Sequence, residues 1–366
     1  MYTSKGILMK LIRHILFPFS ILYGLITAFR NSLYHLKIFK GVTFDLPIIS
    51  VGNLTAGGTG KSPHVEYLIR LLKEEYCIAT LSRGYGRSIS GFHMVKSTSV
   101  VADCGDEPLQ FKNKFSDVVV AVQKDRVNGV IELMKQEPNI DCILLDDCFQ
   151  HRRISPGFNV LLTEYHRPFF KDWMLPTGNL REWTIGRKRA NTIVVTKCPE
   201  KLSPKEQDAF IQKIKPKPWQ TVYFSSFRYG KIAPVHSGIT YSDISDLRGF
   251  NILLITGIAN PLPIINKLES EDLNVTHMRF TDHHPFSNKD IKKVQKLFDT
   301  FGGNKIILST EKDAQRLRMV DGAAELSIHY LEIEVFFVKD ETTFNKEIED
   351  YVRQHKADSK IFEGSD

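Results

Sequence analysis

Short apolar runs alternate with stretches of helical periodicity along most of the chain. The runs are rich in β-branched side chains, as expected of strands that are buried on both faces. We predict strands at residues 47–51, 77–81, 118–122, 142–145, 159–162 and 192–195, with helices at 62–72 and 125–136. This alternation predicts an α/β fold, with a parallel sheet that helices cover on both faces.

A second, smaller α/β unit is predicted after Lys215-Pro216-Lys217-Pro218, which interrupts the regular pattern. The length of 366 residues fits two domains. We therefore predict a larger domain over residues 36–225 and a smaller α/β domain over residues 226–366. The expected elements of the smaller domain are strands at 251–256, 305–308 and 330–337 and helices at 261–269 and 343–355.

The N-terminal segment, residues 1–35, has a different pattern. Residues 15–29 carry no charge, and one helix of that length spans roughly 22 Å, short of the ~30 Å hydrocarbon core of a bilayer. Ser20 and Gly24 fall on one helical line with Lys10, whereas apolar side chains cover most of the remaining surface. We predict an amphipathic helix that lies in a membrane interface.

The basic residues of this segment, Lys10 and Arg13 among them, are expected to face anionic head groups. Pro18 is expected to kink or split the helix, because proline has no N–H to donate. Three alternatives remain open: a buried core helix, a true membrane span and a cleaved signal peptide.

Composition and charge narrow the classes of partner. Hydrophobic residues make up 42% and charged residues 25%, which is typical of a globular protein. The net charge is +7, but the first 44 residues hold six basic side chains and no acidic one, so the remainder is nearly neutral. No basic stripe therefore favours nucleic-acid binding. The five cysteines form no Cys-x-x-Cys pair, which indicates reduced thiols in a cytosolic domain.

A glycine-rich loop joins the first predicted strand to the first predicted helix. Its sequence is Thr55-Ala56-Gly57-Gly58-Thr59-Gly60-Lys61-Ser62. Such a loop turns backbone N–H groups toward phosphates, its lysine reaches the terminal phosphates, and its hydroxyl can ligate Mg²⁺. We predict that it binds ATP with Mg²⁺, although Thr55 stands where the strict pattern has glycine.

Paired carboxylates follow another predicted strand. Asp146 and Asp147 come directly after residues 142–145, the arrangement of a Walker B element that holds Mg²⁺ directly or through water. The alternative is a solvated turn. Gln150 and His151 on the same turn are candidates for contacts with phosphate or substrate.

Two further motifs carry candidate proton-transfer groups. Asp106 precedes a predicted helix and is a candidate general base or metal ligand; the alternative is a helix N-cap. His283 follows Asp282, and a carboxylate beside an imidazole is a pairing that orients a proton acceptor. The alternative is a surface turn.

Other charged loops offer supporting contacts. Glu182 is a candidate for the Mg²⁺ shell, and Arg181 and Arg83 are candidates for phosphate contacts. Thr310-Glu311-Lys312-Asp313 is reminiscent of the guanine-reading motif of GTPases, but its first residue is threonine, so GTP specificity is unsupported.

Taken in order, these motifs resemble the tetraacyldisaccharide 4′-kinase family, the lipid A 4′-kinases. The resemblance runs from the N-terminal helix to Asp313. It rests on residues 52–63, Ser82-Arg83-Gly84-Tyr85-Gly86, Gly105-Asp106-Glu107-Pro108, Asp146-Asp147 with Phe149-Gln150-His151, residues 175–182, Asp282-His283-His284 and residues 310–313. Cys148 stands where the family usually has glycine, so the turn after Asp147 is expected to be tighter or differently angled.

The resemblance implies a peripheral or monotopic kinase on the cytoplasmic face of the bacterial inner membrane. Its acceptor would be an acylated glucosamine disaccharide lipid, phosphorylated on the 4′-hydroxyl by ATP and Mg²⁺, with no obligate protein partner. Asp106 would be the catalytic carboxylate, His283 its partner and Lys61 the phosphate ligand. The resemblance also implies that the smaller domain closes over the nucleotide.

Two other functions remain as alternatives. A membrane-organising ATPase of the partitioning type also combines a Gly-Gly-x-Gly-Lys loop with an amphipathic helix, but carries a signature lysine where this chain has Ala56. A metal-insertion GTPase is disfavoured by the absent guanine motif.

Overall fold

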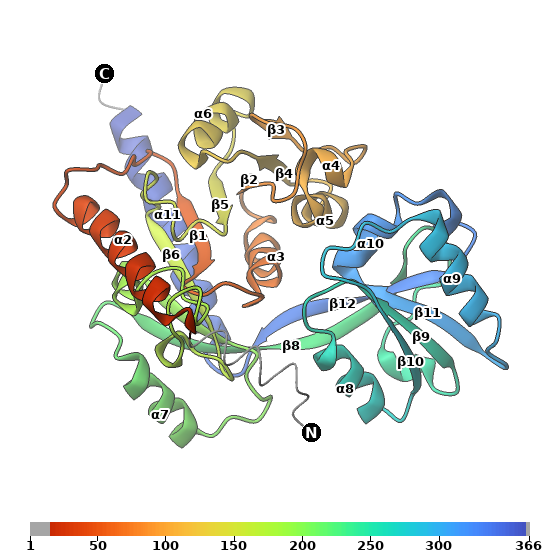
Figure 1. Ribbon diagram of the computed structural model, residues 1–366. Helices are drawn as coiled ribbons and strands as arrows, with labels where there is room; N and C mark the ends of the chain where they lie inside the picture. The colour runs from red at the N-terminus through yellow and green to blue at the C-terminus, as the bar shows by residue number, and fades with distance from the viewer. Residues whose placement is uncertain (1–14, 364–366) are drawn as a thin grey trace. The chain divides into compact units, whose positions relative to one another are not determined.

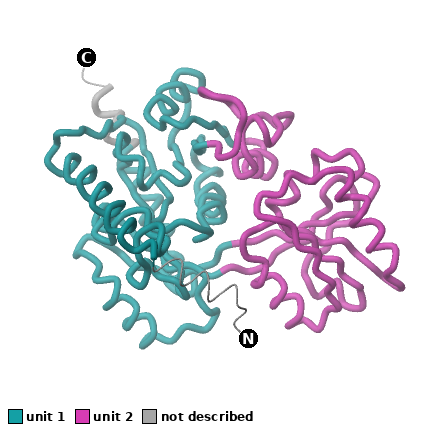
Figure 2. Tube along the Cα trace, in the orientation of Figure 1, with its two compact units in different colours: residues 1–83, 118–226, 335–366 teal, residues 84–117, 227–334 magenta. Residues whose placement is uncertain are grey.

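The structure is a computed structural model that describes residues 15–363 (Figure 1). Lys10 and Arg13, expected on the polar line of the first helix, lie outside the described residues. The chain forms two compact units (Figure 2). Unit 1 comprises residues up to 83, 118–226 and from 335 onward, and unit 2 comprises 84–117 and 227–334.

The units differ from the predicted domains in two segments. Residues 84–117 belong to unit 2, because the helix α5 (Asp106–Lys114) packs against the helix α10 (Glu311–Leu317) there. The C-terminal helix α11 (Glu341–Glu363) belongs to unit 1, where Glu347 accepts hydrogen bonds from Thr192 (2.8 Å) and Tyr223 (3.0 Å). A single domain boundary in the sequence cannot assign these two segments correctly, because each joins the other unit through tertiary packing.

The sheet of unit 1 is parallel and contains every strand predicted for the first domain. Its strand order is β8-β7-β6-β1-β5-β2-β4. The strands are β1 (Ile48–Asn53), β2 (Ile78–Ser82), β4 (Val119–Val122), β5 (Cys142–Asp146), β6 (Phe158–Glu164), β7 (Thr192–Thr196) and β8 (Thr221–Pro234). The helices are α2 (Phe17–His35), α3 (Lys61–Leu72), α6 (Arg126–Gln136), α7 (Pro204–Ile214) and α11 (Glu341–Glu363), with short turns η1 (Phe169–Lys171) and η2 (Thr184–Arg189).

Unit 2 has its own strands in the order β10-β9-β11-β12, and β8 and β12 each run from one unit into the other. The strands are β9 (Asn251–Thr256), β10 (Asn274–Arg279), β11 (Lys305–Thr310) and β12 (Ile328–Phe337), with the short β3 (His93–Met94). The helices are α4 (Val101–Cys104), α5 (Asp106–Lys114), α8 (Leu262–Ser270), α9 (Asn288–Phe298) and α10 (Glu311–Leu317), with turns η3 (Ile244–Leu247) and η4 (Asp321–Ala323).

Strand register in unit 1 brings two predicted motifs to one edge of the sheet. In β1, Val51 pairs with Asp146 at the end of β5. Both strands are buried along their whole length. Because parallel strands present their carboxyl ends at the same edge, the glycine-rich loop after β1 lies beside the acidic turn after β5.

Helix α2 turns its small residues toward the protein and its large apolar residues outward. Ser20 and Gly24 are its buried positions. Trp183 donates to the Gly24 carbonyl at 2.8 Å, and a Cβ on Gly24 would lie 2.7 Å from the indole. Ile15 is helical and Leu16 is a turn residue directly before α2, so the helix is interrupted beside Pro18, which agrees with the predicted kink or split. Pro18 itself lies in the first turn of α2, where its missing N–H costs no helical hydrogen bond.

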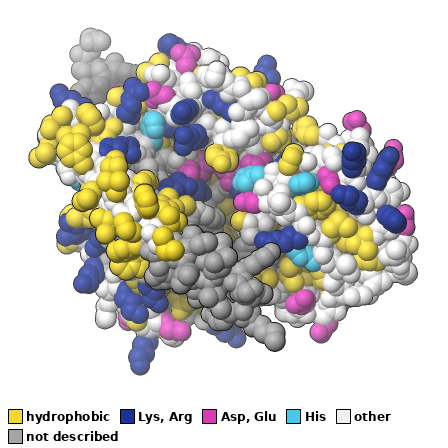
Figure 3. Space-filling view, in the orientation of Figure 1, with side chains coloured by type: hydrophobic (Ala, Val, Ile, Leu, Met, Phe, Trp, Pro, Cys, Tyr) yellow, Lys and Arg dark blue, Asp and Glu magenta, His cyan; other side chains and the backbone are white. Residues whose placement is uncertain are grey.

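The outward face of α2 forms an exposed apolar patch (Figure 3). Its members are Phe17, Phe19, Ile21, Leu22, Leu25, Ile26 and Phe29, with exposed fractions from 38% to 68%. This exposure is the reverse of what a buried core helix shows, so that alternative is wrong for the described residues. No helix of residues 15–363 has the length and apolar character needed to cross a bilayer.

Candidate active site

The glycine-rich loop of unit 1 has the backbone of a phosphate cradle. Gly57 and Gly60 adopt φ values of +112° and +87°, which favour glycine. A Cβ on Gly58 would meet no atom within 4 Å, so the space in front of the loop is open. Gly60 is the N-cap of α3, and no described side chain caps that helix N-terminus. Backbone N–H groups and the helix dipole thus favour an anion here.

The backbone conformation at Thr55 explains why this position of the loop does not require glycine. Its backbone forms an antiparallel bridge with Leu180, and the neighbouring Ala56 N–H donates to Asn179 at 2.6 Å. This part of the loop is extended, a conformation that any residue adopts. The side chain of Asn53, at the end of β1, donates to the Thr59 hydroxyl at 2.8 Å, and this hydrogen bond holds the middle of the loop in place.

Lys61 and Arg181 converge on one carboxylate. Lys61 Nζ lies 3.7 Å from Asp147 Oδ1, and one nitrogen of Arg181 donates to both Asp147 oxygens at 3.0 and 3.1 Å. Burial raises the pKa of Asp147, but the charges of Lys61 and Arg181 outweigh it and hold the pKa below its ordinary value. Asp147 itself, rather than Cys148, takes the left-handed conformation of the turn (φ +45°).

Glu182 is the centre of a second buried cluster. It is 3% exposed, and Arg189 donates to both of its oxygens at 2.8 and 2.9 Å. Gln150 donates to Glu182 at 3.1 Å and to the Asn53 carbonyl at 2.7 Å, which ties this cluster to the base of the loop. Asn31 of α2 also donates to Glu182, at 3.0 Å.

The remaining predicted residues of unit 1 lie around these clusters. Asp146 is buried at the end of β5 and Ser62 is buried in the first turn of α3. Arg83 is exposed, and it is the last residue of the first segment of unit 1. His151 lies 3.7 Å from Asp125, and burial together with Arg126 lowers its pKa. In the described residues, no group of three or more His, Cys, Asp and Glu is placed to hold a metal ion.

Unit 2 brings together Asp106 and His283, which are 177 positions apart. His283 Nδ1 lies 3.0 Å from Asp106 Oδ2, and Asp106 is 7% exposed. Burial raises the pKa of Asp106, but the His283 hydrogen bond and the charge of Lys312 outweigh it and lower the pKa. The same hydrogen bond raises the pKa of His283. The pair thus favours a carboxylate held by an imidazolium.

A buried network holds His283 in an unusual conformation. His283 has φ +54°, and its N–H donates to the Gly257 carbonyl at 3.0 Å. Asp313 accepts from the Gly257 N–H at 3.0 Å, from Thr310 at 2.7 Å and from Arg316 at 2.6 Å. Asp313 is fully buried, so this network fixes the loop that carries His283.

The 310–313 motif therefore supports the Asp106 and His283 pair rather than serving as a guanine-recognition motif. Lys312 forms an ion pair with Glu107, the neighbour of Asp106, and Glu311 accepts from Lys114 at 2.6 Å. Sequence reasoning missed these roles. The one available signal was the charge of the motif directly after a predicted strand.

Comparison with known proteins decides between the predicted functions. A family model described as tetraacyldisaccharide-1-P 4′-kinase matches residues 12–353. The chain belongs to that family. A tetraacyldisaccharide 4′-kinase of Bacteroides thetaiotaomicron is 40% identical, with 95% of each chain covered. One of Flavobacterium johnsoniae is 43% identical, covering 95% of this chain and 99% of the relative.

The similarity to the 4′-kinase family extends to the fold. A solved structure titled as the "apo" form of LpxK from Aquifex aeolicus in complex with ATP is 26% identical, with a TM-score of 0.73. The match covers 93% of this chain and 99% of that chain. These comparisons confirm the recognised family, and they favour the kinase over both the partitioning ATPase and the metal-insertion GTPase.

His64 supports the glycine-rich loop from inside the protein. It is 3% exposed, with Nδ1 at 2.7 Å from the Gly60 carbonyl and Nε2 at 3.0 Å from the Ser225 hydroxyl. Burial lowers its pKa to about 4, so the ring is neutral at pH 7. Nδ1–H therefore donates to Gly60, which accepts only, and Nε2 accepts from Ser225.

We expect His64 to make stability fall on acidification. A folded-state pKa of about 4 lies below the ordinary 6.5, so this contribution is complete above pH 6.5 and is lost as pH falls toward 4. Between pH 7.5 and 5.0 the loss is about 2 kcal/mol. His64→Gln should remove it, as urea unfolding at both pH values measures. An equal loss in variant and parent would contradict this origin.

Proposed function

We propose that this protein transfers the γ-phosphoryl group of ATP to the 4′-hydroxyl of a tetraacylated glucosamine disaccharide 1-phosphate. The observation that carries the proposal is the Asp106 and His283 pair, found in a chain whose family match spans both units. A phosphate loop alone is common to many ATPases. A buried carboxylate held ready to accept a hydroxyl proton is what a kinase with an alcohol acceptor needs.

Lys61 and the loop from Thr55 to Ser62 would bind the phosphates of ATP. Phosphoryl transfer depends mainly on positioning and on neutralising charge. Lys61 already lies against Asp147, which orients its ammonium group, and the open space at Gly58 leaves room for phosphate oxygens. We assign Arg181 and Gln150 to the acceptor side, with Arg83 and His151 as further substrate contacts.

Asp106 would accept the proton of the sugar hydroxyl. His283 would orient the Asp106 carboxylate and favour its ionised form. The lowered pKa of Asp106 keeps the carboxylate deprotonated at neutral pH. Its Oδ1 accepts from the Glu107 N–H at 3.0 Å, and Oδ2 faces His283. Both hydrogen bonds fix the carboxylate orientation, which supports the role of general base.

The chain's hydroxyl and carboxylate groups fit Mg²⁺. Bound at this loop, Mg²⁺ would neutralise charge on the phosphates, and one or two protein ligands suffice to hold it. Ser62 and Asp146 are the proposed ligands, since both lie at the edge that carries the loop. Asp147 and Glu182 are held by Arg181 and Arg189, so either would have to exchange an arginine partner to ligate the metal.

We propose that α2 places the protein on the cytoplasmic face of the bacterial inner membrane, as a peripheral or monotopic protein. The support is the exposed apolar patch on the outward face of α2. A surface of this kind indicates contact with an apolar phase. It would hold unit 1 where an acyl-anchored sugar is accessible. Nucleic acid and an obligate protein partner form no part of this proposal.

We expect Leu25→Glu with Phe29→Glu to lower vesicle affinity at least tenfold, because both side chains are exposed on α2 (61% and 68%). Sedimentation with phospholipid vesicles measures the effect. The matched control is Ile131→Glu with Met134→Glu on α6, which adds the same charge to exposed apolar positions elsewhere in unit 1. Equal losses of vesicle affinity in both double variants would contradict the proposed role of α2 in membrane binding.

The decisive assay is transfer of label from γ-labelled ATP to a detergent-dispersed tetraacyldisaccharide 1-phosphate, with Mg²⁺ and with EDTA. Mg²⁺-dependent label in the lipid is the expected result. ATP hydrolysis that bare vesicles stimulate, without labelled lipid, would contradict the proposal and restore the membrane-organising ATPase.

A further inference from the structure

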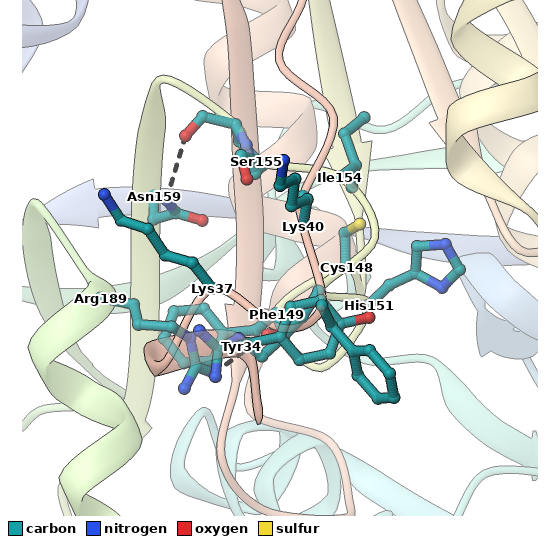
Figure 4. Close-up of a pocket in the computed structure, with 14 residues that line it drawn as sticks. Tyr34, Lys37, Lys40, Cys148, Phe149, His151, Ile154, Ser155, Asn159 and Arg189 are labelled. Carbon is teal, nitrogen blue, oxygen red and sulfur yellow. Dashed lines mark hydrogen bonds between the residues drawn. The ribbon is translucent and has the colours of Figure 1, made fainter. Parts of the chain in front are cut away.

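A cationic cavity of about 460 Å³ lies in unit 1 at the C-terminal end of α2 (Figure 4). Its walls come from residues 34–41, from residues 148–156 and from two side chains of neighbouring segments. Four of its lining residues are cationic and none is acidic: Lys37, Lys40, Arg152 and Arg189. No residue of the glycine-rich loop lines it, so it is separate from the proposed ATP site.

Two of the cations form a fixed wall. Arg152 donates to the Asn31 carbonyl at 2.9 Å and lies 4.7 Å over the ring of Tyr34. Arg189, paired with Glu182, lies 4.4 Å over the ring of Phe149. Both guanidinium groups are thus positioned before any ligand arrives, which lowers the entropic cost of binding an anion.

The local field around this wall is positive. Burial first, and then the charges of Arg152 and Arg189, lower the pKa of His35. Burial and Arg189 likewise lower the pKa of Arg152. Glu182 acts the other way on Arg152 and pairs with Arg189, so it offsets part of this charge. The lining still holds four cations and no acidic residue, and this excess favours an anion in the cavity.

Lys37 and Lys40 are the adjustable part of the cavity. Both are exposed, and neither pairs with an acidic side chain among the residues that the structure describes. Figure 4 shows them on the side of Ser155 and Asn159. A Cβ on Gly41 would lie 2.1 Å from the Ser155 hydroxyl oxygen, so glycine lets this segment pass close to the polar wall.

Apolar side chains alternate with these lysines. Leu36, Ile38 and Phe39 are 70%, 63% and 46% exposed, and they follow the apolar face of α2 along the chain. A site for a free phosphate compound would not need an apolar rim. Lysines interleaved with exposed apolar residues are the pattern of a surface at the level of lipid head groups.

We propose that this cavity binds a lipid-borne phosphate, with Arg152 and Arg189 as its fixed wall and Lys37 and Lys40 as its adjustable cations. Two lipids could supply that phosphate. One is an anionic glycerophospholipid of the bilayer, and the other is the acceptor through its 1-phosphate, a source that rests on the proposed function. The cavity includes His151, which belongs to the same turn as Gln150, a residue that we assign to the acceptor side.

The test uses the full chain with Lys37→Gln and Lys40→Gln combined. The matched control is Lys205→Gln with Lys213→Gln, two exposed lysines of α7 in the same unit. Both double variants change the net charge equally. Circular dichroism and thermal unfolding establish that each variant is folded before binding is compared.

The first arm measures sedimentation with vesicles of phosphatidylcholine alone and with phosphatidylglycerol added. A phospholipid site predicts that the Lys37 and Lys40 variant loses at least fivefold more affinity than the control, and only on anionic vesicles, at about fivefold per lysine near a charged surface. The second arm measures phosphorylation of detergent-dispersed acceptors with a 1-phosphate or a 1-hydroxyl. A substrate site predicts that KM rises at least fivefold for the 1-phosphate acceptor only, with kcat unchanged.

Changes within twofold of the control in both arms would overturn the proposal. Failure of the proposed function gives a different result: the parent protein would label neither acceptor. The vesicle arm alone then decides, and equal binding by the two variants would still refute a phospholipid phosphate site.

Discussion

Asp106→Asn should lower kcat by about 10²- to 10⁴-fold and leave ATP affinity within about twofold. Asparagine keeps the size of the side chain and its contact with the Glu107 N–H, but cannot accept the hydroxyl proton. A base acts in the transition state, so its loss falls on kcat rather than on ground-state binding. Steady-state transfer to the lipid acceptor, with ATP affinity measured separately, checks both quantities.

Asp272→Asn is the control for this variant. Asp272 is exposed in unit 2 with φ +57°, a conformation that asparagine tolerates, so near-parental turnover is expected. An unchanged kcat in Asp106→Asn would reject the base assignment. A tenfold or larger loss of ATP affinity would instead indicate that Asp106 acts in binding.

The pH profile gives a second measure of the same pair. The His283 hydrogen bond lowers the pKa of Asp106, against the effect of burial. His283→Ala removes that bond, so the pKa of Asp106 rises and the carboxylate becomes protonated at a higher pH. The acidic limb of kcat/KM should therefore move to higher pH. A limb that stays in place would show that His283 does not act through Asp106.

Lys61→Met should reduce kcat/KM by about 10²- to 10³-fold, the second large effect. The charge that Lys61 brings to the phosphates is lost, and a flexible methionine of similar length preserves packing. The fold should be retained, because Arg181 still donates to both oxygens of Asp147. Thermal unfolding and steady-state transfer separate these two expectations.

The exposed Lys124→Met serves as the matched control, since it removes one charge from unit 1 outside the loop. Turnover of Lys61→Met within tenfold of the parent would refute the phosphate role. A large fall in unfolding temperature would instead show that the Lys61 and Asp147 ion pair is mainly structural.

Six strands of unit 1 were predictable because burial on both faces selects continuous apolar runs, whereas β8, which is buried only in part, was missed. In β5 and β7 every residue is buried, and composition alone identifies such strands. β10 escaped prediction, since its residues are exposed or half-buried and include Thr276, His277 and Arg279. An exposed strand of mixed polarity has no pattern that distinguishes it from a loop.

The site was predictable residue by residue but not as an assembly. Loop glycines carry a local requirement for positive φ, which the sequence expresses directly. The contact of Asp106 with His283 depends on residues 84–117 packing within unit 2, and the family resemblance was the sole indication of it. The support that Asp313 gives to Gly257 has no local signature, because the partner lies 56 positions away.

The attachment of α2 has a consequence for which lipids can react. Tyr23 donates to the Arg181 carbonyl, Arg30 to the Gln150 carbonyl and Asn31 to Glu182, so the helix is fastened to the residues around Asp147 at three points. If α2 lies in the membrane interface, as we propose, unit 1 would hold its phosphate-handling groups at a fixed height above the acyl chains. A sugar would then have to reach that height while its chains remain in the membrane. Chain length and head-group size would thereby become selection criteria without any side chain that recognises them.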